Sequence, residues 1–531
     1  MHSSIVEKGE MEMVDKNMNK KIEDLHVRKK RILLGGGSEK VGKQHASGKF
    51  TARERIEKLL DKGSFREIGA FARHRCSSFG MEKIEAPADG VITGYGKIDG
   101  RNVMVFSHDF TVLGGTQAEV HSLKIVKIKD LAAQVGVPII GINDSAGGRI
   151  QEGVDALGKG TAIFCRNVIY SGVIPQISAI LGPCAGGAVY EPALTDFVFM
   201  TESIGYMFLT GPKVIKQVTG EDIQIQELGG TSVHCNTTGV AHFYTKTEEE
   251  CFESIRRLLS FLPSNNKERP PVRHDGDPPD RENQELLEIV PIDFRKPYDV
   301  ARIISEVVDN QYFYEVHKNW ARNIVVGFGR MNGNPTGFIA NQPRVLAGAI
   351  DINASDKAAR FIRFCDAFNI PLITFVDTPA FLPGKNQEFG GIIRHGAKLL
   401  YAYAEATVPK ITVILRKAYG GGYSAMGHRE LGTDLVFAWP TAEIAIMGPE
   451  GAAEIIFRRE IEAAEDPTQK RQEKMEAFRK HFGHPYIAAS RGYVDDVIDP
   501  AKTREYLCFG LQLLLEKHQS LPPKKHGNIP L

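Results

Sequence analysis

Two glycine-rich turns are the part of this sequence whose residue types and spacing could do chemistry. Glycines 186–187 come shortly after an apolar run, residues 177–181, and glycines 420–422 follow a similar run, residues 411–415. Each run has the length of a strand, and we expect the first strand to stop at Gly182. Because glycine has no Cβ, its backbone can adopt positive φ and another molecule can approach closely. Exposed N–H groups there could hold an oxyanion; the alternative is two ordinary turns.

An internal repeat relates the two turns. Residues 112–115 match residues 345–348, and Asp144 matches Asp377, at one offset (377 − 144 = 233). Gly186 matches Gly420 one residue later (420 − 186 = 234). This register indicates two homologous halves with the glycine turns at equivalent positions. The equivalence favours an oxyanion role at both turns over two unrelated loops.

Composition narrows the classes of partner and compartment. The 531 residues predict two sizeable domains. Lys plus Arg number 66 against 65 Asp plus Glu, so no net field exists to attract nucleic acid or an anionic membrane. The seven cysteines are scattered without a CxxC pair, which argues against a zinc ribbon or a disulfide framework. We therefore expect a reducing compartment, the cytoplasm.

The order of apolar runs and breakers predicts the elements that position the turns. Short apolar strands such as residues 103–106 and 138–142 alternate with helical segments such as residues 118–135, which predicts an α/β fold with helix-covered sheets. Residues 167–190 carry no charge, but Pro175 and Pro183 would break a membrane-spanning helix, so we expect buried sheet and turn and no membrane insertion.

A Pro-rich polar stretch separates the two halves and suits an exposed linker. We predict a polar lead-in at residues 1–30, a first domain at residues 31–265, a linker at residues 266–291 and a second domain at residues 292–531. The lead-in has no apolar segment of the kind found in a signal peptide, and we expect it to fray.

Motifs for other chemistries are missing from the sequence. It contains no HExxH, no paired-carboxylate motif and no Cys/His signature, so we expect no metal site and no ordinary acid–base mechanism. Asp144 and Asp377 each close an apolar run, and we interpret them as caps of a turn or helix rather than catalytic groups. Two loops of backbone donors suit a reaction in which an oxyanion develops on each reactant.

Several long motifs carry a family resemblance. They are Glu-Pro-Ala-Leu-Thr-Asp at 191–196, Asp-Ser at 144–145 with Arg-Ile-Gln-Glu-Gly at 149–153, Val-Asp-Thr-Pro at 376–379, Ala-Tyr-Gly-Gly at 418–421 and the ending 524–531. Over residues 33–531 the chain resembles the carboxyltransferase subunit of biotin-dependent acyl-CoA carboxylases, and it is most similar to the propionyl-CoA carboxylase β subunit.

The resemblance implies a fold, partners and site residues. It implies two tandem crotonase-like (ClpP/crotonase) domains, a homohexamer with the site between subunits, an acyl-CoA substrate, and carboxybiotin on a separate carrier linked to a biotin carboxylase subunit. Carboxybiotin would release CO2, its ureido nitrogen would take the α-proton, and the enolate would capture CO2. Gly186 and Gly187 match one oxyanion hole, and Gly421 and Gly422 match the other. The residues expected to bind substrate are Ala185, Tyr419, Gly420, Ser424, Gly147 and Gly148.

The chain departs from the family pattern at three places, which leaves part of the interpretation open. Ala146 and Ala380 alter loops beside the expected site, and Ser424 stands where the family commonly has Asp or an aliphatic residue and where the acyl chain is chosen. Propionyl-CoA carboxylation to methylmalonyl-CoA is the expected reaction. The alternatives are a subunit of a biotin-dependent methylmalonyl-CoA decarboxylase or transcarboxylase running the reverse transfer, and an inactive scaffold paralogue.

Overall fold

The computed structural model describes residues 3–531 of the chain, with side chains from residue 17 onward, and these residues form two compact units. Unit 1 comprises Met1–His234 and Tyr244–Arg256, and unit 2 comprises Cys235–Phe243 and Arg257–Leu531. The short segment Cys235–Phe243 belongs to unit 2 because its rings pack there: His242 stacks on His317 with ring centroids 4.1 Å apart. The predicted domain and linker boundaries remain predictions.

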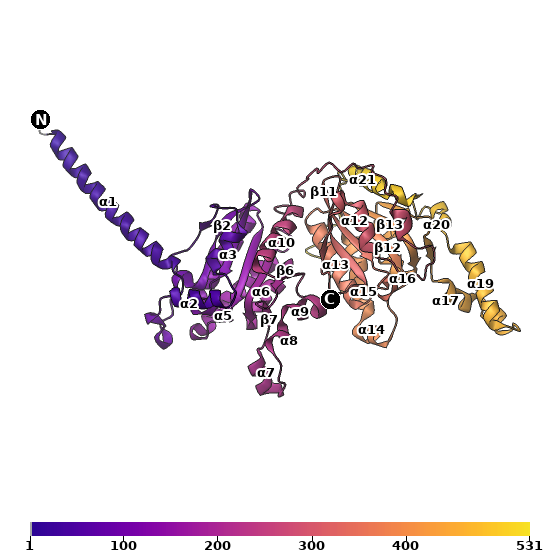
Figure 1. The fold of residues 1–531 in the computed structure, drawn as a ribbon, viewed down its shortest axis with the longest axis horizontal. Helices are drawn as coiled ribbons and strands as arrows, with labels where there is room; N and C mark the ends of the chain where they lie inside the picture. The colour runs from indigo at the N-terminus through magenta and orange to yellow at the C-terminus, as the bar shows by residue number, and fades with distance from the viewer. Residues whose placement is uncertain (1–2) are drawn as a thin grey trace. The chain divides into compact units, whose positions relative to one another are not determined.

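Unit 1 is built on an eight-stranded sheet with the order β1-β2-β3-β4-β5-β6-β8, and β7 branches from β5 (Figure 1). The strands from β3 to β6 are parallel, while β1, β2 and β3 are antiparallel neighbours. The strands are β1 Arg66–Glu67, β2 Val91–Ile98, β3 Arg101–His108, β4 Ile139–Ser145, β5 Gln176–Ala185, β6 Phe197–Thr201, β7 Tyr206–Phe208 and β8 Phe243–Thr245.

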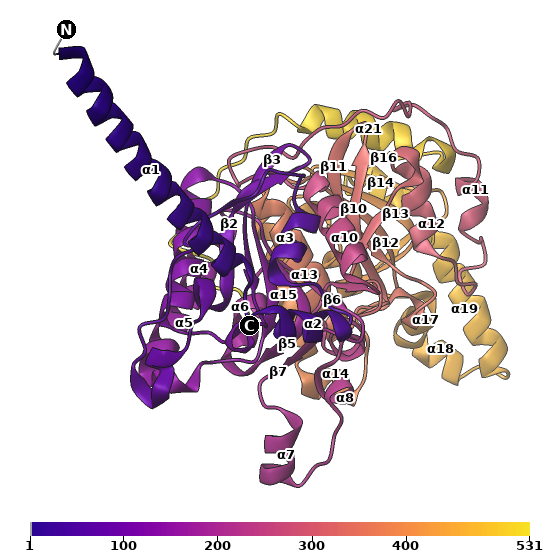
Figure 2. The ribbon, with the colours of Figure 1, turned by 60° about the vertical axis from the view of Figure 1, so that its left-hand side comes forward.

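The helices of unit 1 lie between these strands in the chain. They are α1 Ser3–Leu33, α2 Ser38–Ala46, α3 Ala52–Leu59, α4 Glu119–Val135, α5 Gly153–Ile169, α6 Tyr190–Ala193, α7 Pro212–Thr219, α8 Ile225–Gly229 and α9 Thr231–Val233, with short helical turns η1 Ser78–Lys83, η2 Pro87–Gly90, η3 Leu113–Gly115, η4 Ile150–Glu152 and η5 Gly186–Val189. Helix α10 Glu248–Phe261 begins in unit 1 and ends in unit 2, and the turn η6 His234–Thr238 lies mostly in unit 2. The predicted lead-in coincides with most of α1, which Figure 2 shows as one long helix extending from the unit.

Unit 2 repeats the topology with the order β16-β14-β13-β12-β11-β10-β9, and β15 branches from β13. Its strands are β9 Tyr314–Val316, β10 Ile324–Met331, β11 Asn334–Asn341, β12 Leu372–Thr378, β13 Lys410–Tyr419, β14 Leu435–Ala438, β15 Glu443–Ala445 and β16 Asp496–Val497. Its helices are α11 Leu286–Ile289, α12 Val300–Val307, α13 Ile352–Ala367, α14 Lys385–Gly390, α15 Ile392–Glu405, α16 Gly420–Ser424, α17 Pro449–Ile456, α18 Arg458–Glu462, α19 Pro467–Phe482, α20 Tyr486–Ser490 and α21 Thr503–Leu514, with turns η7 Asp309–Gln311, η8 Leu346–Gly348, η9 Arg429–Leu431 and η10 Pro500–Lys502.

Local sequence explains where these elements begin and end. Helix α3 begins at a capping box, in which Thr51 and Glu54 satisfy each other's backbone N–H groups, and helix α4 ends at Gly136 with φ 74°. Ile125 and Ile128 of α4 pack on Phe106 in one core, and all eight residues of β10 are buried, as expected of a sheet covered on both faces. The two homologous sheets confirm the predicted α/β fold.

In the part of the chain that the structure describes, no helix is both long enough and apolar enough to span a bilayer.

Candidate active site

Each glycine turn follows the carboxyl end of a central strand of its sheet. That strand pairs on one side with two different neighbouring strands along its length. Strand β5 pairs with β6 through residues 177–180 and then with β7 through residues 183–185, and its register against β4 shifts between Asn143 and Ser145. Strand β13 switches in the same way from β14 to β15. The expectation that the first strand stops at Gly182 is wrong, because the second partner strand carries β5 on to Ala185.

Both strands then enter a short helical turn at a glycine in the left-handed region. The first turn, η5, begins at Gly186 with φ 63°, and the second turn, α16, begins at Gly420 with φ 52°. Glycine is the residue that adopts this conformation at little cost. The first N–H groups of a helical turn have no intrahelical partner, so each turn presents backbone donors at the end of its strand. The geometry suits the predicted oxyanion role.

The glycines at the turns differ in what surrounds them. A Cβ added to Gly187 meets no atom within 4 Å, and one added to Gly421 comes no closer than 3.8 Å to the Phe381 ring. A Cβ on Gly422 would lie 2.9 Å from backbone carbons of Ala380, so packing alone requires glycine there. Gly187 and Gly421 are the equivalent pair with space for a ligand, and the predicted role of Gly422 competes with this packing requirement.

A cavity of ≈ 250 Å³ lies beside the first turn; its lining includes Gly148, Gly187 and Ala188. Gly147, with φ 105°, packs against the turn, since its Cβ would lie 3.2 Å from the Ala185 carbonyl oxygen. Arg149, which also lines this first-turn cavity, is buried and donates to the carboxylates of Asp89 at 2.6 Å and Glu152 at 2.8 Å. The structure therefore brings together the predicted residues Gly147, Gly148, Ala185, Gly186 and Gly187.

A cavity of ≈ 650 Å³ lies beside the second turn and contains Gly420, Gly421 and Ser424. The Ser424 hydroxyl donates to the Gly420 carbonyl at 3.3 Å. The rest of this second-turn cavity is mainly apolar and includes Tyr423, Ile444, Ile446, Ile456, Phe478, Phe482, Ile487 and Tyr493. Sequence reasoning missed Phe478 and Phe482, because α19 is rich in Lys, Arg and Glu and its apolar residues show no strong helical stripe.

Tyr419, predicted to bind substrate, is engaged inside the fold. Its hydroxyl donates to the Glu443 carboxylate and thereby joins the ends of β13 and β15. Burial, together with this hydrogen bond, raises the pKa of Tyr419 far above its ordinary value, so the side chain stays a neutral donor. Its observed contacts support a role in holding the second turn.

The strand-end aspartates are centres of buried ion pairs. Asp144 accepts from Arg55 at 2.8 Å and Lys49 at 3.0 Å. Asp377 accepts from Arg416 at 3.0 Å and from the Tyr298 hydroxyl at 2.9 Å. Both carboxylates are fully buried. The interpretation of these residues as caps of a turn or helix is therefore wrong. Each carboxylate instead forms a buried ion pair with a cationic side chain.

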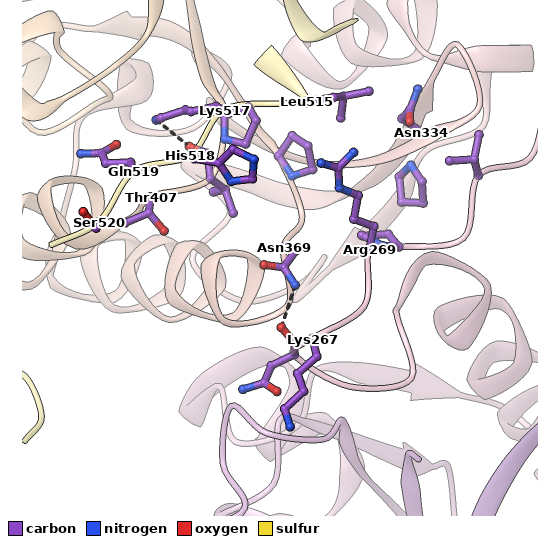
Figure 3. A pocket seen from close by; sticks show the side chains of 17 residues that line it. Lys267, Arg269, Asn334, Asn369, Thr407, Leu515, Lys517, His518, Gln519 and Ser520 are labelled. Atoms are coloured by element: carbon purple, nitrogen blue, oxygen red, sulfur yellow. Dashed lines mark hydrogen bonds between the residues drawn. The ribbon is translucent and has the colours of Figure 1, made fainter. Parts of the chain in front are cut away.

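A third cavity, of ≈ 760 Å³, lies at the opposite end of the unit 2 strands (Figure 3). Pro371 and Pro409, which line this amino-end cavity, directly precede β12 and β13. In Figure 3 the Asn369 side chain hydrogen-bonds the segment that carries Lys267, and the amide donates to the Asn266 carbonyl at 2.8 Å. Ligands of open α/β sheets bind at the carboxyl ends of strands, so we place the site at the glycine turns.

Among the side chains of residues 17–531, no group of three or more His, Cys, Asp or Glu is arranged to hold a metal ion.

Comparison with known proteins gives one consistent family. Residues 43–529 match the carboxyl transferase domain family. The chain is 57% identical over 514 residues to the carboxyltransferase subunit of propionyl-CoA carboxylase from Haloferax mediterranei, covering 97% of this chain and 100% of that protein. It is 54% identical over 512 residues to methylmalonyl-CoA decarboxylase subunit alpha from Propionigenium modestum, covering 96% and 99%.

A solved structure shares the fold. Transcarboxylase 12S, described as a hexamer assembly with methylmalonyl-coenzyme A and methylmalonic acid bound, superposes with a TM-score of 0.94 at 53% identity, covering 97% of this chain and 98% of that one. This likeness confirms the predicted pair of crotonase-like domains. With a family match that covers residues 43–529 and relatives above half identity along nearly the whole chain, this protein belongs to the carboxyl transferase domain family.

Proposed function

We propose that this chain is the carboxyltransferase subunit that moves a carboxyl group from carboxybiotin, held on a separate carrier protein, to the α-carbon of propionyl-CoA. The observation that carries the proposal is the pair of equivalent glycine turns, each beginning with N–H groups that have no intrahelical partner and each beside its own cavity. The identity of 57% to a propionyl-CoA carboxylase subunit supports the choice of substrates.

The residues act as fixed electrostatic partners. Carboxybiotin would supply the CO2 and a ureido nitrogen that accepts the α-proton. N–H groups at Gly186 and Gly187 would stabilise the oxyanion that develops on one reactant, and those at Gly421 and Gly422 the oxyanion on the other. Removing one such donor typically costs about 10²–10³ in rate. Ala185, Gly147, Gly148, Gly420, Ser424 and Tyr419 would shape and hold the two binding sites.

The proposal includes an assembly and a location. A homohexamer is supported by the hexamer assembly described for transcarboxylase 12S, and a partner that carries biotin is supported by the family. The chain is proposed to work in the cytoplasm, in keeping with cysteines that are scattered in sequence without a CxxC pair.

The reverse transfer is the second candidate function. It is favoured by the 54% identity to methylmalonyl-CoA decarboxylase subunit alpha, only slightly below the 57% to the carboxylase subunit. In that reaction the same two turns would act, since a transition state is shared by both directions.

The test is transfer from an isotopically labelled carboxylated carrier to propionyl-CoA by the purified chain, followed by the reverse reaction from labelled methylmalonyl-CoA. Transfer in the first assay supports the proposal, and the ratio of the two rates measures the preferred direction. Failure of transfer in both directions, with the oligomer intact, would leave the scaffold paralogue as the correct alternative.

A further inference from the structure

In each unit the same two loops are joined by backbone hydrogen bonds. In unit 1 the Gln117 N–H donates to the Gly147 carbonyl at 2.8 Å, and the Arg149 N–H donates to the Gln117 carbonyl at 2.8 Å. In unit 2 the Ile350 N–H donates to the Ala380 carbonyl at 3.1 Å, and the Leu382 N–H donates to the Ile350 carbonyl at 2.8 Å. These isolated bridges place Gly148 and Phe381 at equivalent positions (381 − 148 = 233).

In unit 1 this position is open. A Cβ on Gly148 meets no atom within 4 Å, and the same holds for Gly187 across the first-turn cavity. Helix α5 also presents Gly160 to this cavity of ≈ 250 Å³. Where glycines line a cavity, a ligand can approach the backbone closely, and a cavity of ≈ 250 Å³ holds a slender arm of a ligand rather than a bulky group.

In unit 2 the same position is filled. The Phe381 ring lies 3.8 Å from where a Cβ of Gly421 would be and 2.9 Å from where a Cβ of Gly396 would be. Gly396 is on α15, which follows the loop as α5 does in unit 1. A void of roughly 150 Å³ accommodates benzene, so one phenyl ring would fill more than half of a cavity of the ≈ 250 Å³ seen in unit 1.

We propose that Phe381 is a specificity-determining residue. Its ring fills the space beside Gly421 in unit 2, whereas the equivalent residue Gly148 leaves the space beside Gly187 open in the first-turn cavity. As a result, only the first of the two otherwise equivalent turns admits the slender thioester arm of an acyl-CoA. The second turn opens instead to the ≈ 650 Å³ cavity beside Ser424. In a site shared between subunits, as the resemblance implies, the acyl end of the substrate held at the first turn of one subunit would reach this cavity of its neighbour. This inference rests on the proposed function, because it takes acyl-CoA as the slender ligand.

The test exchanges the two residues and counts binding sites by titration calorimetry on the full chain in its native assembly. Propionyl-CoA should bind the wild type at one site per chain. Gly148→Phe should weaken that site by at least about tenfold, the lower end of what a misfitted apolar group costs. Phe381→Gly should add a second site, and the double variant should retain one site. Phe389→Ala, which removes a phenyl ring that is 80% exposed on α14, is the matched control and should bind as wild type.

Two results would overturn the inference while the proposed function stands: wild-type affinity in Gly148→Phe, or an unchanged single site in Phe381→Gly. The Gly148→Phe arm decides the matter even where Phe381→Gly fails to fold, since the added side chain at position 148 enters open space. A wild type that binds no propionyl-CoA would overturn both the inference and the proposed function.

Discussion

Gly182 and Asp144 are in such close contact that a Cβ on Gly182 would lie 2.0 Å from the Asp144 carboxylate oxygen. The equivalent position in unit 2 holds Arg416 (416 − 182 = 234), and that side chain is itself the partner of Asp377. In unit 1 the compensating charge comes instead from Arg55 on α3. The two halves thus have equivalent buried carboxylates, and each carboxylate is neutralised by a cation from a different element.

Breaking the unit 1 pair should destabilise the fold. Arg55→Leu leaves the fully buried Asp144 without its nearest guanidinium, and removing one partner of a buried pair costs about 3–5 kcal/mol. The free energy of unfolding from urea titration measures this. The control is Arg28→Leu in the exposed pair with Asp24, where an i,i+4 contact is worth about 0.3–0.5 kcal/mol. Equal losses in the two variants would contradict the prediction.

Valine at either open glycine should stop carboxyl transfer without unfolding the chain. Gly187→Val or Gly421→Val adds a side chain where the nearest atoms are at least 3.8 Å away, and it should lower the transfer rate by about 10²–10³. Gly158→Ala, in open space on α5 and outside the cavity lining, is the control. Near-normal turnover in a Gly187→Val, Gly421→Val double variant would sink the oxyanion role.

The acyl-chain preference should respond to Ser424. Ser424→Ile fills part of the second-turn cavity and should shift preference from propionyl-CoA towards acetyl-CoA, because one methylene in an apolar pocket is worth about 10–200-fold. The measurement is kcat/KM for acetyl-, propionyl- and butyryl-CoA in both proteins with a carboxylated carrier. Identical ratios before and after the substitution would show that Ser424 does not touch the chain.

Acid should destabilise unit 1 through a buried histidine. Burial lowers the pKa of His108 from 6.5 to about 4, so between these values the unfolded chain binds a proton that the folded chain does not. Stability is therefore lost as pH falls from about 6.5 to 4, by about 1.4 kcal/mol per pH unit. Asn341 stands at the equivalent position (341 − 108 = 233), so His108→Asn is a natural replacement.

Unfolding titrations at several pH values check this effect. The slope of stability against pH should fall by about one proton in His108→Asn. An unchanged slope in His108→Asn would show that this ring carries no such linkage.

Sequence patterns predicted the parts of the structure that depend on local physics. The helix expected at residues 118–135 is α4, Glu119–Val135. The strands expected at residues 103–106 and 177–181 lie within β3 and β5, and the strand expected at residues 138–142 overlaps β4 from Ile139 onward. The internal repeat predicts that both glycine turns lie at strand ends, as they do in β5 and β13. These features are encoded in apolar periodicity and in glycine chemistry, which can be read along the chain.

Long-range features could not be predicted in this way. The continuation of β5 past Gly182 depends on β7, a strand of three residues, and the apolar wall made by Phe478 and Phe482 comes from a helix with a mostly charged sequence. The roles of Asp144 and Asp377 depend on cations that are up to 95 residues away, as with Lys49. Such partners are visible only after the chain has folded.

The segment Cys235–Phe243 belongs to unit 2 although the residues on both sides of it belong to unit 1, so during synthesis it must wait for later residues before it can pack. His242 stacks on His317, which leaves the ribosome 75 residues later (317 − 242 = 75). At about 5–20 residues per second, this segment waits roughly 4–15 s for its partner while the strands before it can already pair. Limited proteolysis of stalled nascent chains would register that interval as cleavage within residues 235–243.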